Sequence, residues 1–322
     1  MIRGKRGITS STFKFILAAI AGALIFLFFI RFSFQSVETS SLLEERELIE
    51  HFNDHLEAFG ISEQSYKTIN LFDETTLQFD CTFIGNKGYT RNFNKLVFAP
   101  QTLTGEAITA WTRTWSFPFP IANLYYLSTD NVRTIVVYNQ NTLSLIQKLN
   151  IPHTFNIQYT TAQNLDLPQL HANARSLDAL NIIYLYDIPN PQAIIAALPN
   201  TNLHLAEINP VSHTFTIYTT GTNGFYLGEE MLPGIFFAPD NAPCIITAAL
   251  ERLQQVALVY SQKASLLSTK TDDEDCITRL FQAAQTLDTF RTLDDGVSLY
   301  TYLDLIKEQN TLLEKNDCTP LY

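Results

Sequence analysis

Hydrophobic and polar residues follow three different patterns along this chain, and each pattern predicts a different kind of element. Near the N-terminus the residues 15–30, FILAAIAGALIFLFFI, are apolar without interruption. With Phe32 and Phe34 the stretch reaches about twenty residues, which as a helix is about 30 Å long, the thickness of a bilayer's hydrocarbon core. We therefore predict a transmembrane helix over 15–34, preceded by a short basic tail over 1–14.

A stalk helix over 36–60 is predicted directly after the apolar stretch. Apolar residues recur there at helical spacing, and Gly60 follows them as a stop signal. The helix would carry the rest of the chain away from the membrane. The apolar residues of its predicted face are Leu42, Leu43, Ile49, Phe52, Leu56 and Phe59.

Residues 66–240 are predicted to form a β-meander followed by a small, mostly parallel α/β sheet. Over 68–98 apolar and polar residues alternate on both sides of the turn Gly85–Gly88, which is typical of antiparallel strands. From residue 134 onward, short β-branched runs alternate with short amphipathic helices, a pattern typical of parallel strands with helical crossovers. The fold class expected is therefore α+β and α/β.

A C-terminal three-helix bundle over 243–322 is expected to pack on this domain. Pro243 suits the first turn of a helix. Apolar residues then recur at helical spacing over 245–267, 276–292 and 297–313, with acidic turns between these segments.

The distribution of charge predicts the orientation in the membrane. Arg3, Lys5, Arg6 and Lys14 precede the apolar stretch, and Arg31 closely follows it. Basic residues remain on the cytoplasmic side, so we expect a cell-membrane protein with a cytoplasmic N-terminus and an extracytoplasmic main domain. A cleaved secretory signal is the alternative, although residues 32–36 offer a poor cleavage site.

The main domain is strongly acidic. After residue 35 the chain has 16 basic and 32 acidic residues, a net charge of about −16. Such a surface repels phosphate backbones, which argues against nucleic acid as a partner. It suits a domain that faces salt or a cationic partner.

The N-terminus also supports a processing hypothesis. Lys5-Arg6-Gly7 before a polar octet and an apolar helix resembles the class III signal of archaeal pilins, which is cut after the glycine. The resemblance implies cleavage between Gly7 and Ile8. Lys14 departs from the family pattern, because the apolar run usually begins nearer the cut.

Four cysteines in an exterior domain favour two disulfides over reduced buried thiols. In an up-down-up bundle Cys244 would lie at one end, and Cys276 and Cys318 at the other. A helix of about 24 residues separates these ends by about 36 Å, whereas bridged Cα atoms lie within about 7 Å. The bundle therefore favours Cys276–Cys318, which leaves Cys81 to pair with Cys244.

Both tryptophans lie in one aromatic cluster. The segment 111–120, WTRTWSFPFP, contains Trp111, Trp115, Phe117 and Phe119. Such a cluster can form a membrane-interface belt or a hot spot for a protein partner. Packing in the core or at a domain junction is the simpler interpretation.

The usual motifs of serine hydrolases, zinc proteases and nucleotide-binding proteins are not found in the sequence. It has no GxSxG, HExxH or P-loop pattern and no glycine-rich turn after a predicted strand. His51 and His55 could ligate a metal but have no third ligand at a recognisable spacing. Glu229-Glu230 could act as paired carboxylates, and the turn 187–191 follows a predicted strand where α/β folds bind ligands. We predict neither cofactor, nucleotide nor metal.

Several features together resemble a group of archaeal single-pass membrane-anchored proteins. They are the basic N-terminus with its apolar helix, Trp115-Ser-Phe-Pro-Phe leading to Asn123-Leu-Tyr-Tyr, and the positions Cys244, Tyr260, Cys276 and Cys318-Thr-Pro-Leu-Tyr322. The resemblance implies membrane anchoring and supplies no activity.

The function expected is that of a non-catalytic, single-pass membrane-anchored surface protein. Its extracytoplasmic domain would bind another protein or assemble with further copies. A pilin-like subunit processed after Gly7 is one alternative, and an extracytoplasmic hydrolase whose site is assembled from distant residues is another.

Overall fold

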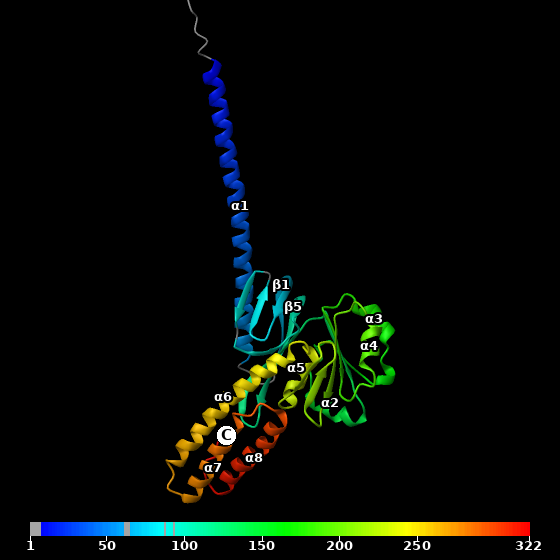
Figure 1. Ribbon diagram of the computed structural model, residues 1–322, viewed down its shortest axis with the longest axis vertical. Coiled ribbons are helices and arrows are strands. Elements are labelled where there is room, and N and C mark those ends of the chain that lie inside the picture. Colours follow the sequence, from blue (N-terminus) through cyan, green and yellow to red (C-terminus); the bar gives the residue numbers. More distant parts are fainter. Residues whose placement is uncertain (1–7, 61–64, 87, 93) are drawn as a thin grey trace, which may run out of the picture.

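The computed structural model describes residues 8–60, 65–86, 88–92 and 94–322 as a mixed α+β body from which a long helix projects (Figure 1). That helix, α1 (Ile8–Phe59), runs for 52 residues. The prediction of separate membrane and stalk helices was wrong, because residues 31–41 contain no proline or glycine that would interrupt the helix. Gly60 follows its end, and a Cβ atom there would overlap the hydroxyl of Tyr125.

The two halves of α1 have different surroundings. Every residue of Lys14–Arg31 is exposed, and this segment is long and apolar enough to cross a membrane. In the other half, Ile49, Phe52 and Leu56 are buried against the first sheet. One helix therefore joins an apolar segment that is exposed along its length to a segment that belongs to the core.

The first sheet has the strand order β3-β2-β1-β5-β6-β4. Its β1, β2 and β3 form the predicted meander, and β5 pairs antiparallel with both β1 and β6. The sheet is mixed, because β4 pairs parallel with β6. Its strands are β1 (Tyr66–Phe79), β2 (Phe83–Asn86), β3 (Tyr89–Asn92), β4 (Leu96–Phe98), β5 (Thr102–Ser116) and β6 (Pro120–Ser128).

The second sheet has the order β12-β11-β10-β9-β7-β8. Neighbours from β8 to β10 are parallel, as expected, whereas β11 and β12 return antiparallel, so this sheet is also mixed. Its strands are β7 (Val132–Val137), β8 (Ile157–Thr160), β9 (Ala179–Tyr184), β10 (Leu203–Asn209), β11 (Thr214–Ile217) and β12 (Thr222–Phe225).

Helices cover both faces of the second sheet. On one face, α3 (Leu167–Ala174) and α4 (Pro191–Ala197) pack on β7, β9 and β10. On the other face lies α5 (Leu232–Phe237), every residue of which is buried. Buried Asn181 on β9 fixes the end of α5, because its amide Nδ2 donates to the carbonyls of Phe236 and Phe237 at 3.1 and 2.9 Å.

Three long helices complete the chain: α6 (Ala242–Ser268), α7 (Glu274–Phe290) and α8 (Gly296–Lys315). In sequence order each packs along the next, and they lie at the end of the body away from the free end of α1 (Figure 1). Pro243 lies in the first turn of α6 as predicted. Asp273 and Asp295 cap the N-termini of α7 and α8 with their side-chain oxygens.

One continuous apolar cluster joins these parts. It contains side chains from β5 and β6, from both sheets' inner faces, and from α5 to α8.

The remaining short helices are η1 (Gln140–Thr142), α2 (Leu143–Leu149), η2 (Ala162–Asn164) and η3 (Glu229–Met231).

Candidate functional site

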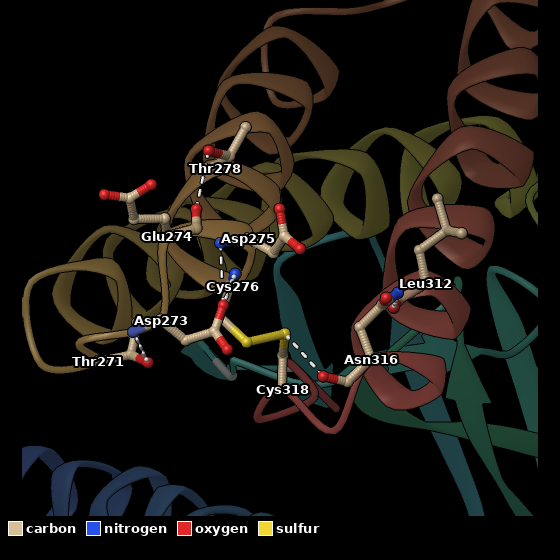
Figure 2. The surroundings of a disulfide bond; sticks show 9 residues. All are labelled: Thr271, Asp273, Glu274, Asp275, Cys276, Thr278, Leu312, Asn316 and Cys318. Carbon is tan, nitrogen blue, oxygen red and sulfur yellow. Dashed lines mark hydrogen bonds between the residues drawn. A yellow bond between two sulfur atoms is a disulfide. The ribbon is translucent and has the colours of Figure 1, made fainter.

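The four cysteines lie in the two pairs that the sequence favoured. The Cα atoms of Cys276 and Cys318 are 5.5 Å apart, and those of Cys81 and Cys244 are 5.7 Å apart. Figure 2 shows the first pair, where Cys276 lies in the first turn of α7 and Cys318 follows α8. The second pair ties the strand β1 to the start of α6. Both bridges therefore hold secondary elements together.

Asp80 lies beside the second disulfide. The ligand atoms of Asp80, Cys81 and Cys244 are within 4.8 Å of one another, a spacing that could suit a metal ion. Both sulfur atoms belong to the disulfide, however, and a disulfide is not the thiolate that binds zinc. With Cys81 and Cys244 oxidised to a disulfide, this group of residues links two parts of the chain and offers no thiolate to a metal ion.

The aromatic cluster lies in the core. Trp111, Trp115, Phe117 and Phe119 are exposed by 4% or less. The indole Nε1 of Trp115 donates to the carbonyl of Leu227 at 2.7 Å. Phe117 and Phe119 pack against aromatic rings of α6, α7 and α8. The hypothesis that these side chains form an exposed partner hot spot was wrong, because all four are buried: Phe117 and Phe119 lie under the C-terminal helices, and Trp111 packs against Tyr126 and Phe155.

The processing position is only partly described. Ile8 is the first residue of α1, whereas Gly7 lies outside the described residues.

The candidate carboxylates Glu229 and Glu230 do not form one site with Asp80. Asp80 follows β1 near the beginning of β5, since Phe79 N–H donates to the carbonyl of Gln101. Glu229 and Glu230 lie in η3 near the other end of β5, close to Trp115. Glu229 is exposed and its Oε1 lies 4.0 Å from Nζ of Lys148. These acids are therefore separated by the length of a fifteen-residue strand.

The carboxylate of Glu207 on β10 is hydrogen-bonded to the loop that follows β9. Oε2 of Glu207 accepts hydrogen bonds from the backbone N–H of Ile188 at 2.9 Å and from the hydroxyl of Tyr218 at 2.8 Å. Burial, followed by the hydrogen bond to Glu207 and its charge, raises the pKa of Tyr218 to about 12. Glu207 thus fixes the turn 187–191, where the sequence suggested a ligand.

His51 and His55 pack against each other on α1. Their ring centroids are 4.4 Å apart in an edge-to-face arrangement. Burial, with the neighbouring charge of His51, lowers the pKa of His55. Within the part of the chain that is described, no third metal ligand joins this pair.

The best candidate for a small-molecule site is a pocket of about 370 Å³ between the first sheet and the α2–β8 connection. One wall is formed by β1 and β5, and the other by the connection between α2 and β8. Ligand sites commonly lie at such junctions, and this volume is within the range that they occupy. The lining residues are Tyr66, Trp111, Arg113, Lys148, Leu149, Asn150, Ile151, Pro152 and His153.

The charge of this pocket differs from that of the domain around it. Arg113, Lys148 and His153 line it, and among the residues that the structure describes no carboxylate does. Arg113 lies over the ring of Trp111, with its Cζ 5.7 Å from the ring centroid. A cation over an aromatic face is stabilised by the ring quadrupole.

Sequence analysis did not identify this pocket, because its walls come from positions about forty residues apart. Trp111 was noticed only as a member of the aromatic cluster. The signal that the sequence does carry is the combination of Lys148, Asn150 and His153 around the predicted end of a short helix.

Comparisons of this chain with protein-family models, with curated proteins and with solved structures find no match.

Proposed function

We propose that this chain is a single-pass membrane-anchored surface protein whose extracytoplasmic domain binds another protein or a further copy of itself. The observation that carries the proposal is α1: its apolar half is exposed along Lys14–Arg31, while its other half is built into the first sheet. Exposure of so many apolar side chains to water would be strongly unfavourable, whereas a bilayer would cover them.

Two further features support this proposal. Disulfides persist in oxidising compartments, and both cysteine pairs lie at bridging distance. The basic residues of the tail favour a cytoplasmic N-terminus. In this arrangement the β and α/β region, with the C-terminal helices as a three-helix bundle packed on it, faces the exterior.

A groove between β4 and α6 supports the binding of a protein. Its volume is about 480 Å³, and it lies beside the disulfide that involves Cys81. Val256 and Val259 supply apolar contact, and Glu251 and Arg252 supply charge of both signs. Val259 is 62% exposed. Mixed apolar and charged surfaces of this kind are typical of transient protein interfaces.

Alkaline carbonate extraction of membranes tests the anchor. The full chain is expected to remain in the membrane pellet, whereas a variant that lacks residues 8–31 is expected in the supernatant. Release of the full chain would contradict the proposal.

Site-specific photo-crosslinking in cells tests the binding of a protein. A photoreactive amino acid at position 259 is expected to form a defined adduct. The same residue at Val211, which is 89% exposed in the loop before β11, is the matched control and is expected to form none. Equal adducts at both positions, or none at 259, would argue against the groove.

A filament subunit processed after Gly7 is the second candidate. The observation that favours it is the same continuous helix, because an exposed apolar half could pack against copies of itself after extraction from the membrane. The N-terminal residue of the protein from its native membrane distinguishes the two. Ile8 would support processing, whereas Met1 or Ile2 would support a plain anchor.

A further inference from the structure

We propose that the pocket between β5 and the α2–β8 connection binds a small organic carboxylate with a planar body, through Arg113 and the aromatic wall of Trp111. This inference is independent of the membrane anchor, because it concerns only residues of the folded body. It assigns a ligand class to a site that the fold alone does not explain.

The aromatic wall is rigid before any ligand binds. The ring of Trp111 lies 4.8 Å from that of Tyr126 and 6.3 Å from that of Phe155, so neighbouring rings fix its position. Leu149, which is buried, forms an apolar part of the lining. Tyr66 lies at the rim and is 63% exposed. A pre-formed apolar wall with a few polar groups is the usual construction of a small-molecule site.

Arg113 has the donors that a carboxylate requires. Its Nη1 donates to the carbonyl of Leu149 at 3.4 Å, a long hydrogen bond. Arg113 makes no ion pair with the residues described in the structure. A guanidinium has five N–H donors in a planar fork that matches a carboxylate in two-point contact, so donors remain for a ligand.

Arg113 also has a structural role that must be separated from binding. Leu149 is the last residue of α2, and a cation near a helix C-terminus stabilises the free carbonyls there. This role uses the positive charge and one N–H. It explains neither the open volume beside the guanidinium nor the further basic side chains around it.

Lys148 and His153 make the pocket a local cationic site on an acidic domain. Lys148 is well exposed, and its distance of 4.0 Å from Glu229 is at the limit of an ion pair, which at the surface contributes little. The ammonium therefore remains available to a second anion. The domain as a whole has a net charge of about −16, so an anion would be attracted at this place rather than over the general surface.

The planar fork of one arginine favours a carboxylate over a phosphate. Phosphate sites commonly gather several backbone N–H groups at a helix N-terminus or in a nest. Here the neighbouring helix presents its C-terminus, which offers carbonyl groups rather than the free N–H groups that a phosphate site uses. Tyr66 and Trp111, which are cross-strand partners on the β1–β5 wall, add contact area for a ring that carries the carboxylate.

Titration calorimetry of the full chain in a zwitterionic detergent tests the proposal, with benzoate as the probe. Benzamide has the same ring without the charge, and inorganic phosphate is an anion without the ring. We expect saturable binding of benzoate in the millimolar range, at least about tenfold weaker binding of benzamide, and weaker binding of phosphate. Benzoate is also expected to change the fluorescence of Trp111, which a Trp111→Phe variant would abolish.

Two substitutions with matched loss of charge identify the binding group. Arg113→Gln is expected to weaken benzoate binding by about tenfold or more. Arg133→Gln is the control, since Arg133 is also half-buried, lies on β7 and donates to Gln158 at 2.8 Å away from this pocket. It is expected to leave the affinity for benzoate unchanged. Arg113→Lys keeps the charge near α2 but loses the fork, so binding should fall while the thermal midpoint is retained.

The proposal is overturned if benzoate does not bind saturably, if benzamide binds equally well, or if phosphate binds more tightly than benzoate. Equal effects of the two arginine substitutions would also overturn it, because the effect would then be one of net charge. If Arg113→Gln fails to fold, Lys148→Gln supplies the test, since Lys148 is exposed. That variant should bind benzoate a few-fold more weakly, and unchanged affinity would count against the site.

Discussion

Gly234 shows how closely the residues of this core approach one another. It lies in the buried helix α5, and a Cβ atom at this position would overlap the ring of Phe98 on β4. Phe98 is itself fully buried and stacks on Tyr126 at 5.8 Å. The ring therefore has little room to move, and the absence of a side chain at 234 allows α5 to lie against the first sheet.

We predict that Gly234→Ala lowers the free energy of unfolding by about 1–3 kcal/mol, because overpacking forces neighbours from their positions. Chemical denaturation followed by circular dichroism measures it. Gly22→Ala in the exposed part of α1 is the control, because its Cβ would meet nothing within 4 Å. An unchanged stability of the Gly234 variant would mean that α5 does not pack on Phe98 as described.

His204 on β10 links stability to pH. Burial lowers the pKa of His204, and the charge of Asp240 opposes this effect. The unfolded chain therefore takes up the proton at a higher pH than the folded chain does, and the linkage predicts that stability falls as the pH drops through about 6.5.

We predict that His204→Gln makes the free energy of unfolding less dependent on pH between about 7.5 and about 5.5. Urea titrations at a series of pH values measure this difference. His213, whose pKa burial also lowers, remains in both proteins and contributes equally. Parallel pH profiles for the native chain and the variant would show that His204 does not carry this linkage.

At the scale of elements, the junction between α1 and the first sheet fixes the orientation of the apolar half of α1 relative to the body. Phe52 is 1% exposed and lies edge-to-face against Phe79 on β1 at 6.3 Å. Nζ of Lys95 donates hydrogen bonds to Oδ1 of Asn53 at 2.8 Å and to Oε1 of Glu57 at 3.1 Å. Apolar contacts and polar contacts together hold the second half of α1 on the sheet.

We predict that Phe52→Ala destabilises the body by about 3–5 kcal/mol, because it leaves a large cavity beneath the sheet. Hydrogen exchange should also become faster in residues 46–59. Leu43→Ala is the control: Leu43 is 61% exposed on the same helix, and its loss should change stability by less than about 0.5 kcal/mol. Similar effects of both substitutions would contradict the docking of α1 on the sheet.

The two disulfides should differ in their contribution to stability. Cys276–Cys318 spans 42 residues, and Cys81–Cys244 spans 163. Loop-closure entropy gives about 4 kcal/mol for the shorter loop and about 5 kcal/mol for the longer one. Replacing each pair by serine and comparing denaturation midpoints tests this order. A larger loss for the shorter loop would show that the unfolded chain is not the main source of the effect.

Elements with a strong local signal were the ones that the sequence could predict. The helices α6 to α8 have regular apolar spacing, aspartates cap α7 and α8, and the helix lengths were enough to favour the cysteine pairing. The long strand β5 was not predicted over residues 102–110, because TLTGEAITA contains a glycine and has no strict alternation. The strand is stabilised by pairing with β1 and β6, which a local pattern cannot show.

The candidate pocket illustrates the same limit for function. Arg113 gives no signal in the sequence beyond a basic residue between two tryptophans. Its significance arises only when the α2–β8 connection lies opposite β5 and places Lys148 and His153 beside it. The packing of the α2–β8 connection opposite β5, rather than any motif, creates this site.

At the scale of the whole molecule, charge and apolarity are separated along the chain. The first 35 residues carry five basic residues and no acidic one, and the remainder carries all 32 acidic residues. The folded body is attached to one end of a continuous helix whose other end is apolar (Figure 1). This separation is the basis of the proposed orientation, with the tail in the cytoplasm and the acidic body outside.

Labelling of single added cysteines tests this central claim most directly. Val211→Cys places a thiol on the body, at a residue that is 89% exposed, and Ser10→Cys places one before the apolar segment. With a membrane-impermeant maleimide, the account predicts that Val211→Cys is labelled in intact cells and Ser10→Cys only after permeabilisation. The reverse pattern, or labelling of both positions in intact cells, would contradict a single-pass anchor with an extracytoplasmic body.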